Sequence, residues 1–301
     1  MEYKKIIKSK KTRSTILSLL SFIPDRIMLQ LQYKIKFDRS LNLKNPIRYT
    51  EKIQWYKLNY RDPVMPQCVD KYTVRDYVKR KGLERILIPL YVHVNNINEI
   101  EWNKLPNEFV IKSTNGGGGL NVIICRDKST FDIDKAIFKL KNKKQKAHTG
   151  GREWAYYGLE PSIIVEKLLV NEENPESSVE DFKFYCFSGE PKYVHVDLDR
   201  YTSHKRNFYD IQWNLLTLES EYPNAKRVID KPKNFNEMLQ VARTLSEDFP
   251  FVRVDLYNIR GKIYFGEMTF YPSSGYAPHN PDEWDYTFGK NFELRSYINK
   301  E

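Results

Sequence analysis

The clearest alternation of apolar and polar residues lies near the C-terminal end of the chain. Residues 251–257 read FVRVDLY, and a period of two places the aliphatic side chains on one face of a strand and Arg253, Asp255 and Tyr257 on the other. Neighbouring residues on one face of a strand are about 7 Å apart. We therefore predict a strand whose polar face carries a guanidinium beside a carboxylate.

A second strand returns after the turn NIRG. It covers residues 262–269, KIYFGEMT, and the alternation groups Glu267 with the apolar Phe265. A carboxylate in this position is unusual, because burying a charge costs several kcal/mol unless the charge is paired or bound to a metal. The pattern predicts a hairpin in which Asp255 and Glu267 hold a cation such as Mg²⁺, and a surface ion pair with Arg253 is the alternative.

Elsewhere the pattern predicts helices and strands in mixed order. Apolar residues at helical spacing, with proline or glycine near the ends, predict helices at residues 25–37, 50–58, 70–82, 131–144 and 235–248. Apolar runs or period-two alternation predict strands within residues 86–94, 109–112, 120–124, 162–170, 181–187 and 192–198. Residues 200–234 are expected to be rich in loops, and the stretch beyond residue 271 is an aromatic and polar tail.

The composition is that of a folded protein, with 41% hydrophobic and 29% charged residues in a chain of 301, enough for two to three lobes. The three cysteines, Cys68, Cys125 and Cys186, include no CxxC pair. Their spacing argues against a disulfide framework or structural zinc and favours a reducing cytoplasm. The longest apolar run, residues 16–23, is less than half of the ~20 residues that span a bilayer, so we expect neither a membrane span nor a signal peptide.

Positive charge is concentrated at one end of the chain. The net charge is +10, and residues 1–48 contain twelve Lys or Arg against three Asp or Glu, which leaves the remainder close to neutral. Such a segment can be attracted to an anionic membrane surface or an anionic glycan, and a solvated lysine-rich helix is the alternative. The charge is confined to this segment and no nucleic-acid-binding motif is present, so we expect no nucleic acid as a partner.

Candidate phosphate-binding residues precede the hairpin. Lys71 stands near the start of a predicted helix, and Lys112 ends a strand before the run NGGGG at residues 115–119. Glycine is entropically costly and an ordinary hairpin needs only one or two, so four in succession suggest a loop that covers a ligand. Two lysines and loop amides could neutralise a triphosphate while two carboxylates hold Mg²⁺. The chain has no GxxxxGK[ST] loop, no kinase signature and no glycine-rich turn that opens a helix.

The order of these features resembles the ATP-grasp superfamily and, more narrowly, its TupA-like group, named for teichuronopeptide biosynthesis. The resemblance covers about residues 50–290. It rests on DKY with VR and YV at residues 70–78, FVIK at 109–112, IVE at 164–166, DFKF at 181–184, RVD at 253–255 and GEMTFYPSSG at 266–275. It implies an α+β fold in which two lobes clasp ATP, with a mainly helical basic N-terminal segment before them.

The resemblance also implies roles for individual residues toward ATP and Mg²⁺. Those implied at the ATP phosphates and their glycine-rich lid are Lys71, Lys112, Asn115, Gly116, Gly117, Gly118 and Gly119. Those implied at the adenine hinge, largely through backbone groups, are Glu166, Lys167 and Leu168. Those implied at the metal are Asp255, Glu267 and Thr269, the last at a position where ATP-grasp enzymes often have asparagine.

Other residues are implied in chemistry or are candidates for substrate binding. Lys183 and Arg253 would steady the γ-phosphate or the acyl phosphate formed from it. Candidates near the substrate are Asp181, Arg200, Ser273 and Ser274. Arg200 belongs to a basic cluster with His204, Lys205 and Arg206, for which an exposed loop is the alternative. The five histidines share no metal-ligand spacing, so we interpret them as structural.

We divide the chain into a helical basic segment (1–67), a small lobe with the glycine-rich lid (68–165) and a C-terminal lobe with hinge and metal site (166–301). The resemblance predicts an ATP-dependent carboxylate-amine ligase that joins an amine, such as an amino acid, to a uronic acid of a surface polysaccharide or its lipid-linked precursor. A glycosyltransferase that uses the DxD sequence Asp197-Leu198-Asp199 is the alternative. We expect a cytoplasmic protein, with peripheral contact to the inner membrane face through residues 1–48 as an option.

Overall fold

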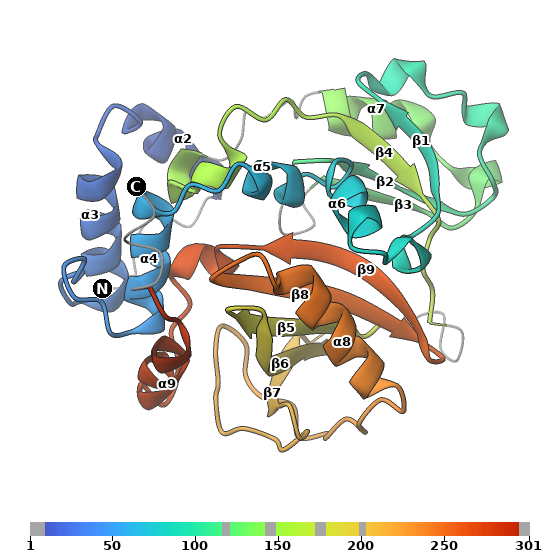
Figure 1. Ribbon diagram of the computed structural model, residues 1–301. Coiled ribbons are helices and arrows are strands. Elements are labelled where there is room, and N and C mark those ends of the chain that lie inside the picture. The colour runs from blue at the N-terminus through green and yellow to red at the C-terminus, as the bar shows by residue number, and fades with distance from the viewer. Residues whose placement is uncertain (1–9, 116–120, 142–148, 172–178, 199–202, 295–301) are drawn as a thin grey trace.

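Two antiparallel sheets dominate the fold (Figure 1). The computed structural model describes residues 10–115, 121–141, 149–171, 179–198 and 203–294. One sheet has four strands in the order β1-β4-β2-β3, and the other has five strands in the order β7-β6-β5-β8-β9. Because helices pack around separate antiparallel sheets, the fold is of the α+β class, as predicted.

The four-stranded sheet consists of β1 (Leu90–Val94), β2 (Phe109–Ser113), β3 (Val122–Cys125) and β4 (Ile163–Glu166). Strands β2 and β3 form the hairpin predicted around the glycine run, although residues 116–120 lie outside the described part of the chain. Helix α7 (Ile133–Lys141) packs on this sheet, and Leu140 joins Phe109 and Val165 in a small core. The hairpin and the helix are confirmed.

The five-stranded sheet consists of β5 (Asp181–Phe187), β6 (Glu190–Leu198), β7 (Lys205–Asp210), β8 (Phe251–Ile259) and β9 (Lys262–Thr269). Helix α8 (Phe235–Ser246) covers one face, where alternate residues of β5 and β8 form the main core. The prediction that residues 200–234 are mostly loop is wrong for β7. Its sequence KRNFYD shows no clean alternation, yet the sheet buries Asn207, Phe208 and Tyr209.

The predicted hairpin of β8 and β9 is present, but its register shifts in the middle. Near the turn Leu256 lies opposite Phe265, whereas further on Asp255 lies opposite Glu267. The shift makes room for one extra residue at Gly266, where a side chain would meet the carbonyl oxygen of Asp255 at 3.0 Å. Without this β-bulge Glu267 would lie opposite a core residue of β8. The bulge, which the sequence pattern did not predict, aligns the two carboxylates.

Helices at both ends of the chain pack together on one side of the sheets (Figure 1). They are α2 (Lys10–Leu19), α3 (Asp25–Phe37), α4 (Tyr49–Asn59) and α9 (Glu283–Asn291). The α4 and α9 helices are linked by Thr50, whose backbone N–H and hydroxyl donate to the Asp285 carboxylate at 2.9 and 2.7 Å. The α9 helix was missed, because the tail that contains it has no regular helical period. The division at residues 67 and 165 stays a prediction.

Two further helices connect the N-terminal helices to the four-stranded sheet. The α5 helix (Val64–Val69) was missed because its prolines were interpreted as breaks, but Pro66 lies in the first turn, where no backbone donor is needed. The α6 helix (Val74–Arg80) begins later than predicted. The Asp70 carboxylate accepts hydrogen bonds from the backbone of Tyr72 and Thr73 and so forms a turn first.

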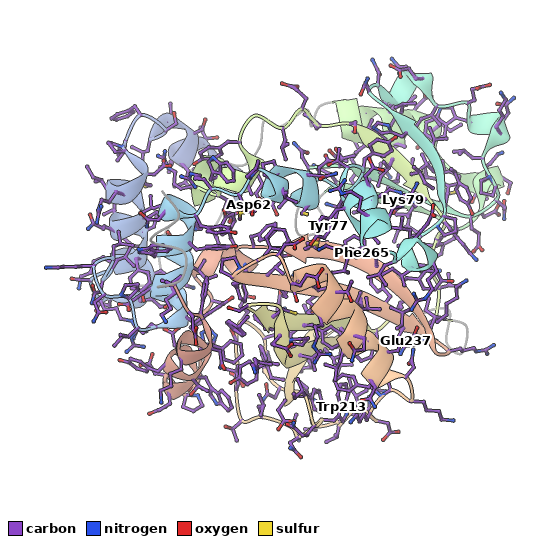
Figure 2. All side chains as sticks on the ribbon, viewed as in Figure 1. Asp62, Tyr77, Lys79, Trp213, Glu237 and Phe265 are labelled. Carbon is purple, nitrogen blue, oxygen red and sulfur yellow. The ribbon has the colours of Figure 1, made fainter. Side chains whose placement is uncertain are left out.

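Side chains fill the space between these helices and the sheets (Figure 2). Tyr77 of α6 and Phe265 of β9 belong to the same large core, and the Tyr77 hydroxyl donates to the Leu245 carbonyl at 3.1 Å. Short 3-10 turns complete the connections: η1 (Glu84–Ile86), η2 (Ile97–Glu99), η3 (Trp102–Lys104), η4 (Lys128–Thr130), η5 (Thr149–Gly151), η6 (Trp154–Tyr156) and η7 (Pro272–Gly275). Within the described ranges, no helix combines the length and apolarity needed to cross a membrane. All three cysteines are free and buried.

Candidate active site

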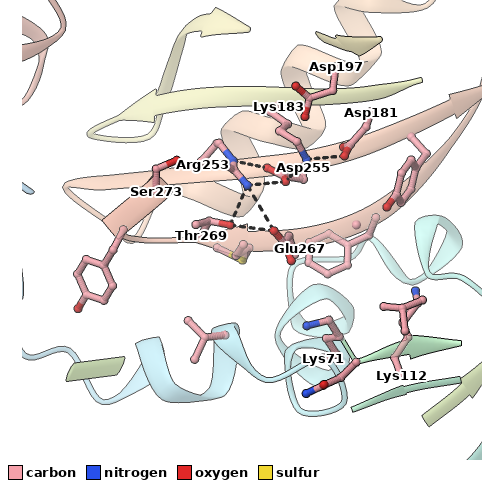
Figure 3. Close-up of a pocket in the computed structure, with 18 of the residues that line it drawn as sticks. Lys71, Lys112, Asp181, Lys183, Asp197, Arg253, Asp255, Glu267, Thr269 and Ser273 are labelled. Atoms are coloured by element: carbon pink, nitrogen blue, oxygen red, sulfur yellow. Dashed lines mark hydrogen bonds and ion pairs between the residues drawn. The ribbon is translucent and has the colours of Figure 1, made fainter. Parts of the chain in front are cut away.

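A cleft of about 830 Å³ lies between the two sheets. One wall is the polar face of the five-stranded sheet, and the other is formed by the four-stranded sheet with the turn before α6 (Figure 3). Apolar residues line one part of it: Val69, Leu87, Ile88, Val122, Ile124, Phe265 and Met268. A partly apolar cleft with convergent charged groups is typical of a site for a nucleotide-sized ligand.

The polar face of the five-stranded sheet is an ordered array of charged side chains. Strand pairing places Lys183 of β5 beside Asp255 of β8, and Asp255 beside Glu267 of β9. Two residues further along the same two strands, Arg253 of β8 lies opposite Thr269 of β9. Residues directly opposite each other on neighbouring strands have Cβ atoms about 5 Å apart, so these side chains meet without any loop movement.

Asp255 is the centre of this array and is almost fully buried. Its carboxylate accepts hydrogen bonds from Arg253 Nε and Nη2 at 2.7 and 2.8 Å and from Lys183 Nζ at 2.5 Å. Lys183 also donates to Asp181 at 2.5 Å. Three charge-assisted hydrogen bonds, one to Oδ1 and two to Oδ2, hold the Asp255 carboxylate in a fixed orientation.

Glu267 lies at the edge of the array and faces Lys71 across the cleft (Figure 3). Its Oε1 lies 3.3 Å from Arg253 Nη2 and accepts a hydrogen bond from the Thr269 hydroxyl at 3.2 Å. Burial alone would raise its pKa, but Lys71, Lys183 and Arg253, together with the Thr269 hydroxyl, lower the pKa of Glu267 to about 2. Glu267 is therefore a carboxylate at any pH near neutrality.

The opposite wall carries cations of its own. Lys112 at the end of β2 and Arg75 of α6 both contact the Glu166 carboxylate, at 2.8 and 3.1 Å. The backbone N–H of Lys71 donates to the Thr114 carbonyl at 2.9 Å, which fixes the turn that holds it. Burial lowers the pKa of Lys71, and the negative charge of Glu267 acts against this shift. Cations on this wall thus face carboxylates on the other.

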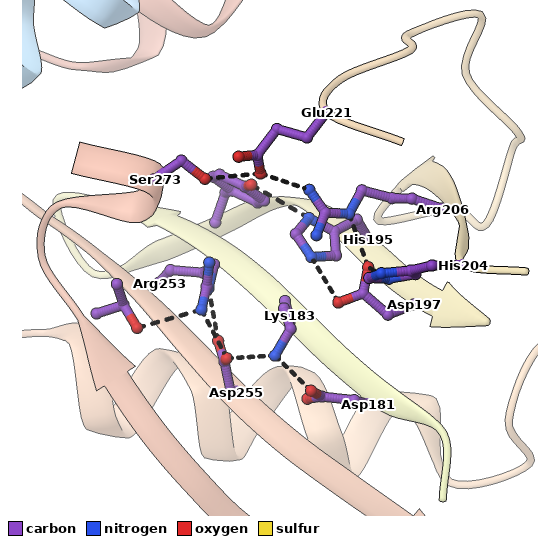
Figure 4. A network of polar contacts seen from close by, with 12 residues as sticks. Asp181, Lys183, His195, Asp197, His204, Arg206, Glu221, Arg253, Asp255 and Ser273 are labelled. Atoms are coloured by element: carbon purple, nitrogen blue, oxygen red, sulfur yellow. Dashed lines mark hydrogen bonds and ion pairs between the residues drawn. The ribbon is translucent and has the colours of Figure 1, made fainter. Parts of the chain in front are cut away.

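A second polar network lies at the β6 and β7 end of the cleft (Figure 4). Arg206 Nε donates to Asp197 at 2.7 Å, and Arg206 Nη1 donates to Glu221 at 3.0 Å. The Ser273 hydroxyl donates to Glu221 at 2.6 Å, and His204 Nε2 lies 3.1 Å from Asp197. Ser273 and Glu221 both have a positive φ, which is uncommon for these residue types and typical of functional loops.

Most of the predicted site residues line this one cleft. They are Lys71, Lys112, Glu166, Asp181, Lys183, Arg253, Asp255, Glu267, Thr269, Ser273 and Ser274. Asn115 is bonded to the Ser113 hydroxyl, and the Lys167 N–H donates to the Pro89 carbonyl; neither they nor Leu168 are among the lining residues. Gly116, Gly117, Gly118, Gly119 and Arg200 lie outside the described residues.

Several lining residues received no role from the sequence. Arg75 belongs to the motif quoted above, but only the fold shows that it contacts Glu166. Glu221 and Tyr222 lie in the segment expected to be loop, and Glu153 and Tyr156 follow a glycine pair. A charged or aromatic residue in an irregular segment gives no periodic signal, so these four could not be found from the pattern.

The DxD alternative receives no support from the geometry. Asp197 is ion-paired with Arg206 and faced by His204, so its carboxylate already has cationic and imidazole neighbours. Asp199 lies outside the described residues. Among the described residues, no three His, Cys, Asp or Glu side chains gather around Asp197 as a metal site.

Comparison with known proteins defines the class of this chain. The family model described as "TupA-like ATPgrasp" matches residues 51–293, which is most of the chain. The chain belongs to the TupA-like ATP-grasp family. The ATP-grasp fold that the sequence predicted is thus confirmed. A comparison with curated proteins finds no significant match.

Three solved structures are similar to the chain at low sequence identity. D-alanine–D-alanine ligase from Bacillus anthracis is 16% identical, with a TM-score of 0.44, over 75% of this chain and 66% of that one. An N5-carboxyaminoimidazole ribonucleotide synthetase is 15% identical, with a TM-score of 0.43, over 67% and 45%. Biotin carboxylase from Campylobacter jejuni is 13% identical, with a TM-score of 0.42, over 75% and 47%. The chain thus spans about half to two thirds of their lengths.

The donor set at Asp255 and Glu267 suits Mg²⁺ that is shared with a nucleotide. Within the described ranges no three His, Cys, Asp or Glu side chains gather as a complete metal site. Mg²⁺ usually takes one or two carboxylates and completes its shell with phosphate oxygens and water. Glu267 Oε1 contacts Arg253 and Thr269, whereas Asp255 is bonded to two cations. Glu267 therefore has the larger capacity for a metal.

Proposed function

We propose that this enzyme forms an amide between an amino acid or other amine and a uronic acid of a capsular or other surface polysaccharide, through an acyl phosphate. One observation carries the proposal. The cations of one wall, Lys71 and Lys112, face the aligned carboxylates Asp255 and Glu267 across a cleft of nucleotide size. Such a cleft can neutralise a triphosphate on one side and hold its metal on the other. The glycan is suggested by the family, whose group is named for teichuronopeptide biosynthesis.

Each wall would have its own task in the reaction. ATP supplies the phosphoryl group that activates the carboxylate, and Mg²⁺ at Glu267 and Asp255 would neutralise its charge. Lys71 and Lys112 would bind the phosphates, and the apolar residues around Leu87 would surround the adenine. Lys183 and Arg253, fixed by Asp255, would orient the γ-phosphate toward the acceptor carboxylate. The residues of Asn115 to Gly119 would cover the phosphates.

The mass of the product tests this proposal directly. Glucuronic- and galacturonic-acid oligosaccharides are incubated with the enzyme, Mg²⁺-ATP and a mixture of amino acids. We expect a glycan that is heavier by one amino acid less one water, and ADP and phosphate in equal amounts. Omission of ATP is the control. Thermal stabilisation by Mg²⁺-UDP-sugars but not by Mg²⁺-ATP, with no such product, would contradict the ligase and favour a glycosyltransferase.

We also propose that the N-terminal helices contact an anionic membrane surface. Ile27, Leu31 and Ile35 follow one another at helical spacing on α3 and are exposed, and Phe22 just before this helix is 80% exposed. The same region carries most of the net positive charge of the chain. Exposed apolar residues beside basic ones are typical of a helix that lies in a membrane interface.

Sedimentation with liposomes tests the membrane contact. We expect the enzyme to sediment with vesicles of phosphatidylserine and phosphatidylcholine and not with phosphatidylcholine alone. The triple variant Phe22→Ser, Ile27→Ser, Leu31→Ser should lose this binding. Ile47→Ser is the matched control, because Ile47 is also exposed but lies outside the helix. Equal sedimentation of the triple variant and the wild type would contradict the contact.

A further inference from the structure

Two loops form the end of the cleft that adjoins the N-terminal helices. One runs from η5 through η6 and supplies Glu153 and Tyr156, and the other is η7, which supplies Ser273 and Ser274. The loops touch, since a side chain on Gly151 would lie 2.7 Å from the Ser274 hydroxyl. We call this part the loop end of the cleft and define it by the four lining residues just named. None of them belongs to a strand, so strand pairing does not fix their side chains.

Lys57 of α4 bonds the two loops to each other. Its Nζ donates to the carbonyl oxygens of Gly151 and Ser274, both at 2.8 Å. It also donates to the Ser274 hydroxyl at 2.8 Å and to Gln54 Oε1 at 3.1 Å. All four acceptors are uncharged oxygens, and Lys57 is only 1% exposed. An ammonium ion is costly to bury among uncharged acceptors, so this position is unusual for a lysine.

The backbone of the η7 turn needs support of this kind. Ser273, Ser274 and Gly275 have φ values of 48°, 57° and 67°, so three successive residues are left-handed, a conformation that serine rarely adopts. Gln54 Nε2 donates to the carbonyl oxygens of Ser274 and Gly275, both at 3.1 Å, beside the bonds from Lys57. The α4 helix therefore holds the turn from one side, and Ser273 lines the cleft on the other.

The loop end lies where an acceptor carboxylate would meet the phosphates. The chain leaves β9 at Thr269 and then reaches Ser273, which lies on the side of Arg253 away from Lys112 (Figure 3). Arg253 lies opposite Thr269 and, in the proposed reaction, orients the γ-phosphate. The acceptor must approach this phosphate in line, from the side opposite the rest of ATP. The loop end is therefore on the side of the acceptor.

The charge of Lys57 depends on pH in a range where the enzyme can be assayed. Burial lowers the pKa of Lys57 to about 8, and the carboxylates of Glu153 in the loop and Asp25 on α3 act against this shift. Asp25 is itself paired with Arg152 at 2.9 Å, and the ring centre of Tyr276 lies 4.9 Å from Lys57 Nζ. As the pH rises through about 8, the amine loses one of its three donors, and the bond between the loops weakens.

We propose that Lys57 is a positioning residue that holds the loop end of the cleft in the shape that receives the acceptor carboxylate. This inference rests on the proposed ligase function. Lys57 takes no part in bond formation and acts on the substrate only through the turn that contains Ser273 and Ser274. The N-terminal helices are then a working part of the active site, because α4 provides the residue that closes one end of it.

Hydroxylamine provides an assay that does not depend on the identity of the amine. It is uncharged above neutral pH and converts the acyl phosphate of a uronic-acid oligosaccharide to a hydroxamate. In Lys57→Met the side chain keeps its length but loses its charge and its donors. We expect kcat/KM for the oligosaccharide to fall roughly 10²-fold, as for a small displacement of reacting groups, while KM for ATP stays within about threefold. Thermal stabilisation by Mg²⁺-ATP shows that the variant is folded.

Lys52→Met is the matched control. Lys52 lies on the same helix and donates to the carbonyl oxygens of Gly289 and Phe292, at 2.8 and 2.7 Å, both outside the cleft lining. Its loss should lower the stability of the fold and leave kcat/KM for the oligosaccharide unchanged. An equal loss of kcat/KM in the two variants, or a Lys57→Met enzyme with the kinetics of the wild type, would overturn the positioning role.

The pH profile of the wild type gives an independent test. Its kcat/KM for the oligosaccharide should fall as the pH rises through about 8, and Lys57→Met should lack this fall. A wild-type profile that stays flat, or the same fall in Lys57→Met, would overturn the role of Lys57 and leave the ligase proposal intact. Absence of hydroxamate from the wild type at any pH would overturn the ligase proposal itself, and this inference with it.

Discussion

The two walls of the cleft hold their charges in different ways. On the five-stranded wall, Lys183, Asp255 and Glu267 come from adjacent strands in direct register and restrain one another. On the four-stranded wall, Lys71 comes from a turn and Lys112 from a strand end, and Lys112 is paired with Glu166 of its own wall. The pairing of adjacent strands thus fixes the side chains of the first wall, whereas the side chains of the second wall come from separate segments of the chain.

This difference suggests a division of labour. Catalysis requires reacting groups to be held within a fraction of an ångström, which a register of adjacent strands provides. Binding of a triphosphate requires mainly positive charge, which tolerates small displacements because the Coulomb energy changes slowly with distance. We therefore expect substitutions on the five-stranded wall to lower turnover, and substitutions on the four-stranded wall to weaken ATP binding.

The largest effect is expected from Glu267→Gln. The amide keeps the shape but loses the charge that would hold Mg²⁺, so ATP turnover should fall by about 10²–10³, the usual effect of a lost electrostatic contact. The fold should persist, because Glu267 is 38% exposed. Release of ADP measures the turnover, and thermal unfolding measures the stability of the fold. Glu237→Gln, on the exposed side of α8, is the control, and an active Glu267→Gln enzyme would contradict the metal assignment.

Asp255→Asn should also abolish turnover, but with a cost in stability that Glu267→Gln lacks. Asp255 is almost fully buried and bonded to Arg253 and Lys183, so its neutralisation leaves two buried cations with less compensation. Breaking such a pair costs about 3–5 kcal/mol. Chemical denaturation should show this difference between the two variants. Equal stability of both would indicate that the array is not held together by Asp255.

Lys112→Met should have a smaller effect and a different kinetic form. Arg75 still neutralises Glu166 in this variant, so the fold should be kept. Loss of a phosphate contact that is made equally before and during the reaction raises KM for ATP without changing kcat. We expect KM to rise about 10-fold to 100-fold, in line with 1.4 kcal/mol for each factor of ten. Lys79→Met is the exposed control, and a loss confined to kcat would contradict the division between walls.

Gly266→Ala tests the bulge that aligns the carboxylates. The new methyl group would lie 3.0 Å from the Asp255 carbonyl oxygen, so the strand must shift. We expect a loss of about 1–3 kcal/mol in unfolding free energy, which is typical of overpacking, and weaker stabilisation by Mg²⁺-ATP in thermal unfolding. Unchanged affinity for Mg²⁺-ATP would show that Glu267 does not depend on the bulge for its position.

The smallest effect concerns acid stability. The pKa of Glu267 is lowered from 4.5 to about 2 by its cationic neighbours, so the folded state binds this proton less readily than the unfolded chain. The resulting stabilisation is complete above the unfolded value of 4.5 and is lost as the pH falls toward 2. Compared with Glu267→Gln, the wild type should lose stability more steeply across this window. If urea denaturation gives the same dependence of unfolding free energy on pH for both proteins, the lowered pKa of Glu267 is contradicted.

Much of the fold and most of the candidate site could be predicted from the sequence, because they depend on periodic strands. The hairpin of β8 and β9, the strand with Lys183 and the strand that ends at Lys112 all show a regular alternation or an apolar run. The bulge at Gly266 could not be predicted, since one glycine in a strand has several meanings. The strand β7 could not be predicted either, because it depends on tertiary packing around Tyr209 and not on local pattern. Glu221 has no local signal, since its contacts are with Arg206 and Ser273 from other parts of the chain.

The joining of α4 to α9 has a consequence for the synthesis of the protein. Tyr49 packs against Phe288 and Phe251, and Lys57 donates from α4 to the carbonyl of Ser274, next to the cleft residue Ser273. The α4 helix leaves the ribosome early, whereas α9 is made only after the nine strands seen in the described ranges. The cleft can therefore be completed only late in translation, and until then the apolar side of α4 must be shielded by other means.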